Sequence, residues 1–185
     1  GHRYELAPQS TQARRQGDGW VLDGEKCVVI GAPWAHRLIV SARTGDAASA
    51  SLFIVDAHAG GVGMNPCRTV DGQRAADTRF TGVTVGADAL LGPEGGALPL
   101  IDEAADFATA LLCAEAIGAM QYANDTTLEY LKTRKQFGVP IASFQVLQHR
   151  MVEMVIHTEQ ARSLAILAAS QVDGGGDAAE RQRAV

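Results

Sequence analysis

The residues best suited to chemistry lie in one stretch, residues 134–145, between two long helical patterns. A cation and two amides gather there around one aromatic ring: they are Arg134, Gln136, Gln145 and Phe137. A guanidinium binds phosphate through two parallel hydrogen bonds, and an aromatic ring offers its face to a flat heterocycle. The cluster is therefore a candidate site for a ligand that carries both groups. The alternative is a basic helix end that only complements the helix dipole above a hydrophobic corner.

Three residues of this stretch predict a corner between two helices. Gly138 can take the left-handed conformation that closes a helix, and Pro140 cannot continue one. Ser143 can accept hydrogen bonds from the first free N–H groups of the next helix. In the alternative interpretation, a hydrophobic corner without a ligand, Phe137, Ile141 and Phe144 fill this corner.

The run R-K-Q-F-G-V-P-I-A-S-F-Q at residues 134–145 resembles the signature of the acyl-CoA dehydrogenases. These enzymes use FAD to introduce a 2,3-double bond into an acyl-CoA thioester. Their usual order is a helical N-terminal domain, a middle β-domain and a C-terminal four-helix bundle. The resemblance covers residues 4–183 and implies a middle β-domain followed by the first half of the bundle.

The resemblance also implies roles for the candidate residues. Arg134 would pair with the pyrophosphate of an FAD bound to a neighbouring subunit, as the arginine of this motif does in the family. Gln136 and Phe137 would lie along the adenosine end, with Gln145 close by.

The positions that would face the flavin ring depart from the family pattern. Residues 19–26 resemble the run G-[YW]-x-L-x-G-x-K, which is normally followed by a tryptophan that flanks the ring and a threonine that hydrogen-bonds it. Val28 and Ile30 stand at these two positions, and Trp34 follows a few residues later.

No catalytic residue is assigned. In the family the base is a glutamate, placed in most members beyond the point where this chain ends. In a minority it lies on the first bundle helix, at the position of Ala108 here. Glu115 and Asp106 share that helix but have the wrong spacing.

The sequence shows no pattern typical of a metal site or of a phosphate-binding loop. The histidines show no metal-ligand spacing; they are His2, His36, His58, His149 and His157. The glycine-rich run at residues 60–63 follows no strand-to-helix pattern, so we expect a turn and not a phosphate loop.

The pattern before Gly92 predicts an antiparallel β-barrel or sandwich over residues 1–92. Residues 11–22 are typical of a hairpin with a positive-φ turn at residues 17–19, and Asp23-Gly24 is expected to form the next turn. Further strands are expected within residues 26–30, 38–42, 51–55 and 78–85.

Beyond Gly92 the hydrophobic period becomes helical, so residues 93–185 are expected to be part of a helical bundle. We predict two long antiparallel helices over residues 97–172, the first about 35 residues long. Apolar residues between Leu147 and Val172 alternate steps of four and three, which is typical of a bundle seam. We expect this seam to be an exposed apolar stripe, because two helices cannot cover it, and therefore to mediate association. A third helix, capped by Asp177, is expected to be cut short. The fold class is therefore α+β.

Composition excludes several classes of protein. The chain has 46% hydrophobic and 20% charged residues and a net charge of −5, which disfavours nucleic acid as a partner. No apolar run approaches a membrane span, and no secretory signal is present. Three cysteines without CxxC spacing are expected to be buried thiols in a reducing cytoplasm.

Three hypotheses on function follow. The first is a fragment of an FAD-dependent acyl-CoA dehydrogenase that contacts the flavin cofactor and is inactive alone. Its partners would be an acyl-CoA substrate, an electron-transfer acceptor and further subunits in a homo- or hetero-oligomeric dimer of dimers. The second is a degenerate subunit that completes another subunit's FAD site. The third is an unrelated interaction module of a barrel and helices.

Overall fold

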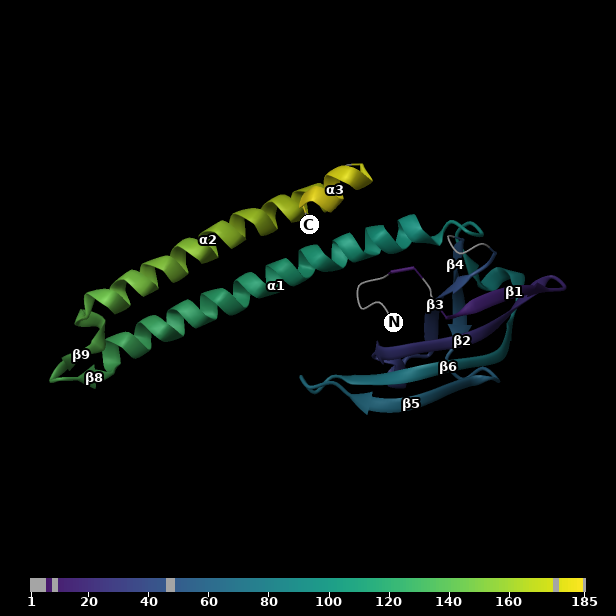
Figure 1. Cartoon of the computed structure of the whole chain (residues 1–185), viewed down its shortest axis with the longest axis horizontal. Coiled ribbons are helices and arrows are strands. Elements are labelled where there is room, and N and C mark those ends of the chain that lie inside the picture. The colour runs from purple at the N-terminus through teal and green to yellow at the C-terminus, as the bar shows by residue number, and fades with distance from the viewer. Residues whose placement is uncertain (1–5, 8–9, 46–48, 175–176, 185) are drawn as a thin grey trace. The chain divides into compact units, whose positions relative to one another are not determined.

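The computed structural model describes residues 6–7, 10–45, 49–174 and 177–184 (Figure 1). The chain divides into two compact units, Gly1–Asp102 and Glu103–Val185. The division falls inside the first long helix, α1 (Ala97–Thr133). A β-unit followed by long helices confirms the predicted α+β fold class.

The first unit is built on one seven-stranded sheet in the order β5-β6-β2-β1-β3-β4-β7. The strands are β1 (Gln12–Gln16), β2 (Gly19–Ile30), β3 (Arg37–Arg43), β4 (Ala50–Asp56), β5 (Val62–Arg68), β6 (Arg74–Val85) and β7 (Leu90–Leu91). Neighbouring strands are antiparallel except β1 and β3, which meet in parallel through Gln12 and Arg43. The two edge strands, β5 and β7, do not pair with each other, so hydrogen bonds among the described residues do not close the sheet into a barrel.

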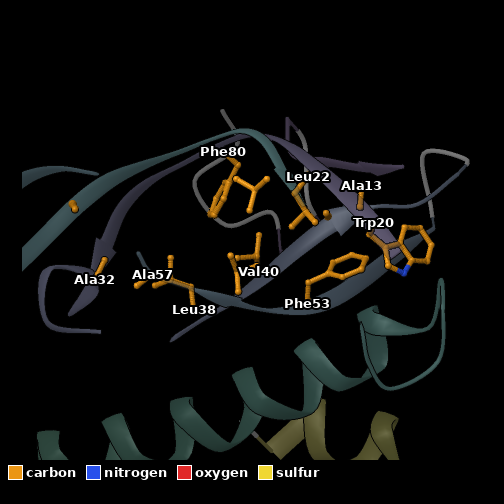
Figure 2. Close-up of a cluster of buried hydrophobic side chains, with 13 residues drawn as sticks. Ala13, Trp20, Leu22, Ala32, Leu38, Val40, Phe53, Ala57 and Phe80 are labelled. Carbon is orange, nitrogen blue, oxygen red and sulfur yellow. The ribbon is translucent and has the colours of Figure 1, made fainter. Parts of the chain in front are cut away.

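The core of this unit lies between two layers of strands, as in a sandwich. Leu22 and Phe80, from β2 and β6, face Val40 and Phe53, from β3 and β4 (Figure 2). The indole of Trp20 meets the Phe53 ring edge-on, with 5.3 Å between the ring centroids. Alternate residues of each strand supply this core because successive side chains point to opposite faces.

The predicted hairpin at the start of the unit is confirmed, whereas the predicted second turn is wrong. Gly17, with φ 60°, helps to turn β1 into β2. At Asp23-Gly24 the chain does not turn: β2 continues to Ile30, and its pairing with β6 shifts register there. The Asp23 carboxylate accepts the backbone N–H of Gly82 on β6 at 2.7 Å. Gly24 has a φ of 140° at this β-bulge.

The expected strands within residues 26–30, 38–42, 51–55 and 78–85 lie in β2, β3, β4 and β6. Strand β5 was not predicted, and two residues of the glycine-rich run assigned to a turn, Val62 and Gly63, belong to it. Pro66 is tolerated in β5 because this strand is at the edge of the sheet.

The cysteines contradict one prediction. Cys27 and Cys67 are exposed and Cys113 is half-buried, so the first two are not the buried thiols that we expected.

The second unit confirms the two long helices. Helix α1 has 37 residues and α2 (Gln145–Asp173) has 29, and they run side by side (Figure 1). Helix α3 (Ala178–Ala184) follows, and Asp177 caps it as predicted, since its Oδ1 accepts the Glu180 N–H at 2.9 Å. Among the described residues, no helix is long and apolar enough to cross a membrane.

The predicted seam is the side of α2 that α1 covers. Seam residues such as Met151, Met154 and Ala161 are half-buried, and Thr158 and Ala168 are buried. The expectation that this seam is an exposed apolar stripe is therefore wrong. Other apolar residues of α2 are exposed instead: Val146, Val152, Val155, Ile156, Leu164, Ile166 and Leu167.

Candidate functional site

Three candidate residues, Arg134, Gln136 and Phe137, lie on a β-hairpin between α1 and α2, and the fourth, Gln145, is the first residue of α2 (Figure 1). Strands β8 (Lys135–Gln136) and β9 (Val139–Pro140) pair antiparallel. The turn residues Phe137 and Gly138 have φ of 53° and 81°. Positive φ at both positions is typical of a type I′ turn. Gly138 is therefore left-handed as expected, but it closes a hairpin and not a helix.

The start of α2 also differs from the prediction. The helix begins at Gln145, and its N-cap, Phe144, gives no side-chain cap. Ser143 does not cap the helix: its hydroxyl donates to the Pro140 carbonyl at 2.7 Å. The Gln148 amide donates to the Ala142 carbonyl at 2.8 Å, which ties α2 to the residues before it.

Phe137 does not fill the corner between the helices, as the hydrophobic-corner interpretation requires. Its side chain is 90% exposed and meets Phe144 edge-on at 6.1 Å between ring centroids. A non-glycine residue in the left-handed region costs about 1–2 kcal/mol. An exposed ring at such a position is costly to the fold, and strain of this kind is a reason to look for function.

The polar members of the cluster are free to bind. The side chains of Arg134, Gln136 and Gln145 are exposed and form no hydrogen bond or ion pair with any described residue. The base of the hairpin is fixed, since the Ile141 N–H donates to the Arg134 carbonyl at 2.8 Å. The hairpin therefore presents a cation, one amide and an aromatic ring from a defined backbone, and the second amide, Gln145, stands at the start of α2.

The positions equivalent to the flavin-ring contacts lie at the end of β2. Val28 and Ile30 are 52% and 58% exposed. Val28 has a φ of 50°, and its N–H donates to the Asp77 carboxylate at 2.8 Å. These side chains offer a ligand apolar surface without an aromatic ring or a hydroxyl.

A hollow of about 580 Å³ opens between β2 and β3 beside Ile30. Half-buried Lys26 lines this hollow; its Nζ donates to the Ser41 hydroxyl at 3.0 Å, and desolvation lowers the pKa of this ammonium. Phe80 and Val40 form part of the apolar wall.

The positions considered for a catalytic base all lie on α1. Ala108 and Glu115 are exposed on α1. Asp106 is largely buried and lies 3.7 Å from the guanidinium of Arg181, so it ties α3 to α1. The described residues contain no cluster of three metal-ligating side chains.

The sequence interpretation missed one cluster. Arg68 and Arg74 lie beside the exposed ring of Trp34, and strand pairing brings them together. Their separation in the sequence gives no local signal for this contact.

Two family models together match almost the whole chain. The family model of the acyl-CoA dehydrogenase middle domain matches residues 2–83, and that of the acyl-CoA dehydrogenase C-terminal domain matches residues 98–185. A probable acyl-CoA dehydrogenase of Bacillus subtilis, YngJ, is 33% identical over 166 residues, which are 86% of this chain and 44% of that protein.

Comparison with solved structures gives the same result. A probable acyl-CoA dehydrogenase from Mycobacterium abscessus superposes with a TM-score of 0.85 at 25% identity, covering 98% of this chain and 50% of that one. An FAD complex of PigA gives a TM-score of 0.86 at 26% identity, covering 95% and 48%. The chain spans about half the length of the relatives that it matches.

Proposed function

Because the chain belongs to the acyl-CoA dehydrogenase family, we propose that it is part of an FAD-dependent enzyme that forms a 2,3-double bond in an acyl-CoA thioester. In this proposal the chain contributes contacts to the cofactor and to other subunits. The observation that carries it is the hairpin at residues 134–140, which exposes the Arg134 guanidinium, without an ion-pair partner among the described residues, and three residues later an aromatic ring at positive φ.

The hairpin fits the nucleotide half of FAD. The Arg134 guanidinium would hold the pyrophosphate in a bidentate contact, and Phe137 would lie against the adenosine. The amides of Gln136 and Gln145 would hydrogen-bond the polar edges of the same group. When bound, FAD supplies the acceptor for the hydride that leaves the β-carbon of the substrate.

The fit to the flavin ring is poorer. Val28 and Ile30 can pack against a ring but cannot stack on it or hydrogen-bond to it. This supports the alternative proposal, in which the chain is a degenerate subunit that completes the FAD site of a catalytic partner.

We infer that this chain alone does not oxidise acyl-CoA. Removal of the α-proton needs a carboxylate within hydrogen-bond reach of that proton, and Ala108 stands at the one family position for a base within the chain. The base would come from residues outside this sequence. Turnover with an artificial electron acceptor, compared with a no-enzyme control, measures this directly.

Association with other subunits is part of the proposal. Exposed apolar residues on both long helices, among them Phe107, Leu112, Ile156 and Leu164, form more apolar surface than an isolated helix pair keeps in water. We propose that further helices or subunits cover them, in a homo- or hetero-oligomer located in the cytoplasm. An electron-transfer protein would reoxidise the flavin.

The proposal is tested by measuring the FAD affinity of Arg134 variants. Arg134→Ala removes a charge-assisted hydrogen bond worth about 1.5–3 kcal/mol, so FAD affinity should fall roughly 10- to 150-fold. Arg134→Lys keeps the charge without the bidentate geometry and should lie between wild type and alanine. Arg150→Ala, which removes an exposed arginine paired with Glu153 on α2, is the matched control.

Mixed assemblies test whether the contact crosses a subunit boundary. An Arg134→Ala chain should lower flavin occupancy in a partner whose own residues are intact, with helix content unchanged. Wild-type occupancy in the mixed assembly would show that Arg134 is only a cation at a helix end.

A further inference from the structure

Two arginines face each other at the end of the β5–β6 pair. Arg68 and Arg74 are direct cross-strand partners. Like charges in this position destabilise a strand pair. Neither arginine forms an ion pair with a described residue. The carboxylate of Asp71, in the turn between the strands, is instead hydrogen-bonded by Thr69 and by the Gln73 amide. The two positive charges therefore have no anionic partner in the described part of the chain.

An exposed tryptophan completes this cluster. Trp34 is 66% exposed, and the guanidinium of Arg74 lies over its ring at 5.3 Å from the centroid. The backbone fixes the arrangement, since the Gly31 N–H donates to the Arg74 carbonyl at 2.9 Å. The short 3-10 helix Ala32–Trp34 starts directly after this bond.

Trp34, Arg68 and Arg74 all line two hollows. One, of about 690 Å³, also includes Pro33, Pro66 and Cys67. The other, of about 480 Å³, also includes Gly31 and Gln73. Both volumes are within the range of small-molecule sites, about 300–1,000 Å³. The hollows share Trp34, Arg68 and Arg74, so a ligand in either one meets the indole and both cations.

These groups select a ligand with two features. A guanidinium stacked on an indole keeps its in-plane N–H donors, which match the oxygens of a phosphate. An exposed indole stacks with a nucleobase. Two neighbouring guanidiniums fit a diphosphate better than a single carboxylate, because each can bind one phosphoryl group. An acidic protein segment would satisfy the charges but would leave the indole without a planar partner.

We propose that the surface formed by Trp34, Arg68 and Arg74 binds a nucleoside diphosphate group, with its base on the indole and its phosphates on the two guanidiniums. This surface is formed by residues of the first unit and uses none of the residues of the hairpin at 134–140, and the proposal does not depend on the proposed function. The group could arrive as a free nucleotide or as part of a larger molecule, since CoA carries it.

The two tryptophans make the test direct. Trp20 is 2% exposed and Trp34 is 66% exposed, so a ligand that stacks on Trp34 quenches its emission and leaves that of Trp20. Titration of the chain with ADP should give saturable quenching with a Kd below about 1 mM. Trp34→Phe should abolish the signal, and calorimetry should still detect ADP binding to this variant.

Variants and simpler ligands test each contact. Arg68→Ala and Arg74→Ala should each weaken ADP binding at least about 10-fold. Arg68→Lys, which keeps the charge and the fold, should have a smaller effect. Arg79→Ala, a β6 arginine paired with Glu25, is the matched control and should change nothing. Adenosine and pyrophosphate should each bind more weakly than ADP, because each lacks half of the contacts.

Several results would overturn the proposal. They are an absence of saturation by ADP, equal binding by pyrophosphate and ADP, or unchanged affinity in both arginine-to-alanine variants. Displacement of ADP by a hexaglutamate peptide at a lower concentration than ADP itself would assign the surface to an acidic protein instead. Displacement by CoA would identify CoA as the source of the group, displacement by FAD and not by CoA would identify the dinucleotide, and failure of both would leave the free nucleotide.

Discussion

A buried hydrogen bond between α1 and α2 should hold the two helices in register. The Asn124 amide donates to the Thr158 hydroxyl at 2.9 Å, and both side chains are buried. The Thr158 hydroxyl donates in turn to the Met154 carbonyl at 2.9 Å. Most other residues along this contact are apolar, so water cannot easily replace a missing partner.

Thr158→Val is the informative change because valine keeps the shape and removes the hydroxyl. It leaves the Asn124 amide buried without a partner, which costs about 1–3 kcal/mol. Asn124→Leu should cost less, since Thr158 keeps its bond to the Met154 carbonyl. The double variant should be more stable than the sum of the single effects predicts, by roughly 0.5–3 kcal/mol, because the unpaired amide is also gone.

Urea unfolding can report each unit separately. Circular dichroism at the helical band follows α1 and α2, whereas both tryptophans lie in the first unit. With a slope of about 1–3 kcal/mol/M, Thr158→Val should lower the helical midpoint by roughly 0.3–3 M and leave the tryptophan transition in place.

The matched control is Thr109→Val on α1. The Thr109 hydroxyl bonds the Ala105 carbonyl at 2.8 Å and has no partner on α2. If Thr158→Val and Thr109→Val cost the same, or if both transitions shift together, the cross-helix bond does not set the register.

Three further predictions concern other parts of the chain. The Asp23 carboxylate accepts the Gly82 N–H and an Arg14 guanidinium hydrogen bond, which lower its pKa below 3.8. Its stabilisation is therefore complete above that value and is lost as pH falls through the folded-state pKa, so Asp23→Asn should flatten the acid limb of the tryptophan-monitored unfolding curve. Phe137→Asn should raise helical-unit stability by about 1 kcal/mol, because asparagine tolerates positive φ, while FAD affinity falls. Leu164→Asp, at an exposed position on α2, should shift sedimentation toward smaller species, whereas Met151→Asp should mainly lower stability.

Sequence patterns correctly predicted the elements that are determined by residues close together in the chain. Helices α1 and α2 follow from a sustained helical period, and the β1–β2 hairpin follows from its glycine turn. The bulge at Asp23-Gly24 was predicted as a turn, since these residue types favour both. What decides between them is the bond from Asp23 to the Gly82 N–H, which lies far along the chain.

For the candidate residues, the sequence pattern did not predict the β-hairpin on which most of them lie. A glycine at positive φ suits a helix end and a type I′ turn equally, so Gly138 alone could not distinguish them. The turn has Phe137 at the other positive-φ position, which propensity disfavours. Arg68 and Arg74 become a pair only through the register of β5 and β6.

The exposed side chains of the second unit support one explanation. The apolar residues of the α2 seam are covered by α1, whereas the exposed apolar residues lie on other sides of α2. Exposure is therefore not spread evenly around this helix. A helix that is apolar on several sides is buried by several neighbours. The hairpin has the same character, since the positive φ of Phe137 costs the isolated chain strain while its ring is exposed to solvent. Both features favour an assembly in which other polypeptide segments cover the helices and a bound nucleotide occupies the hairpin.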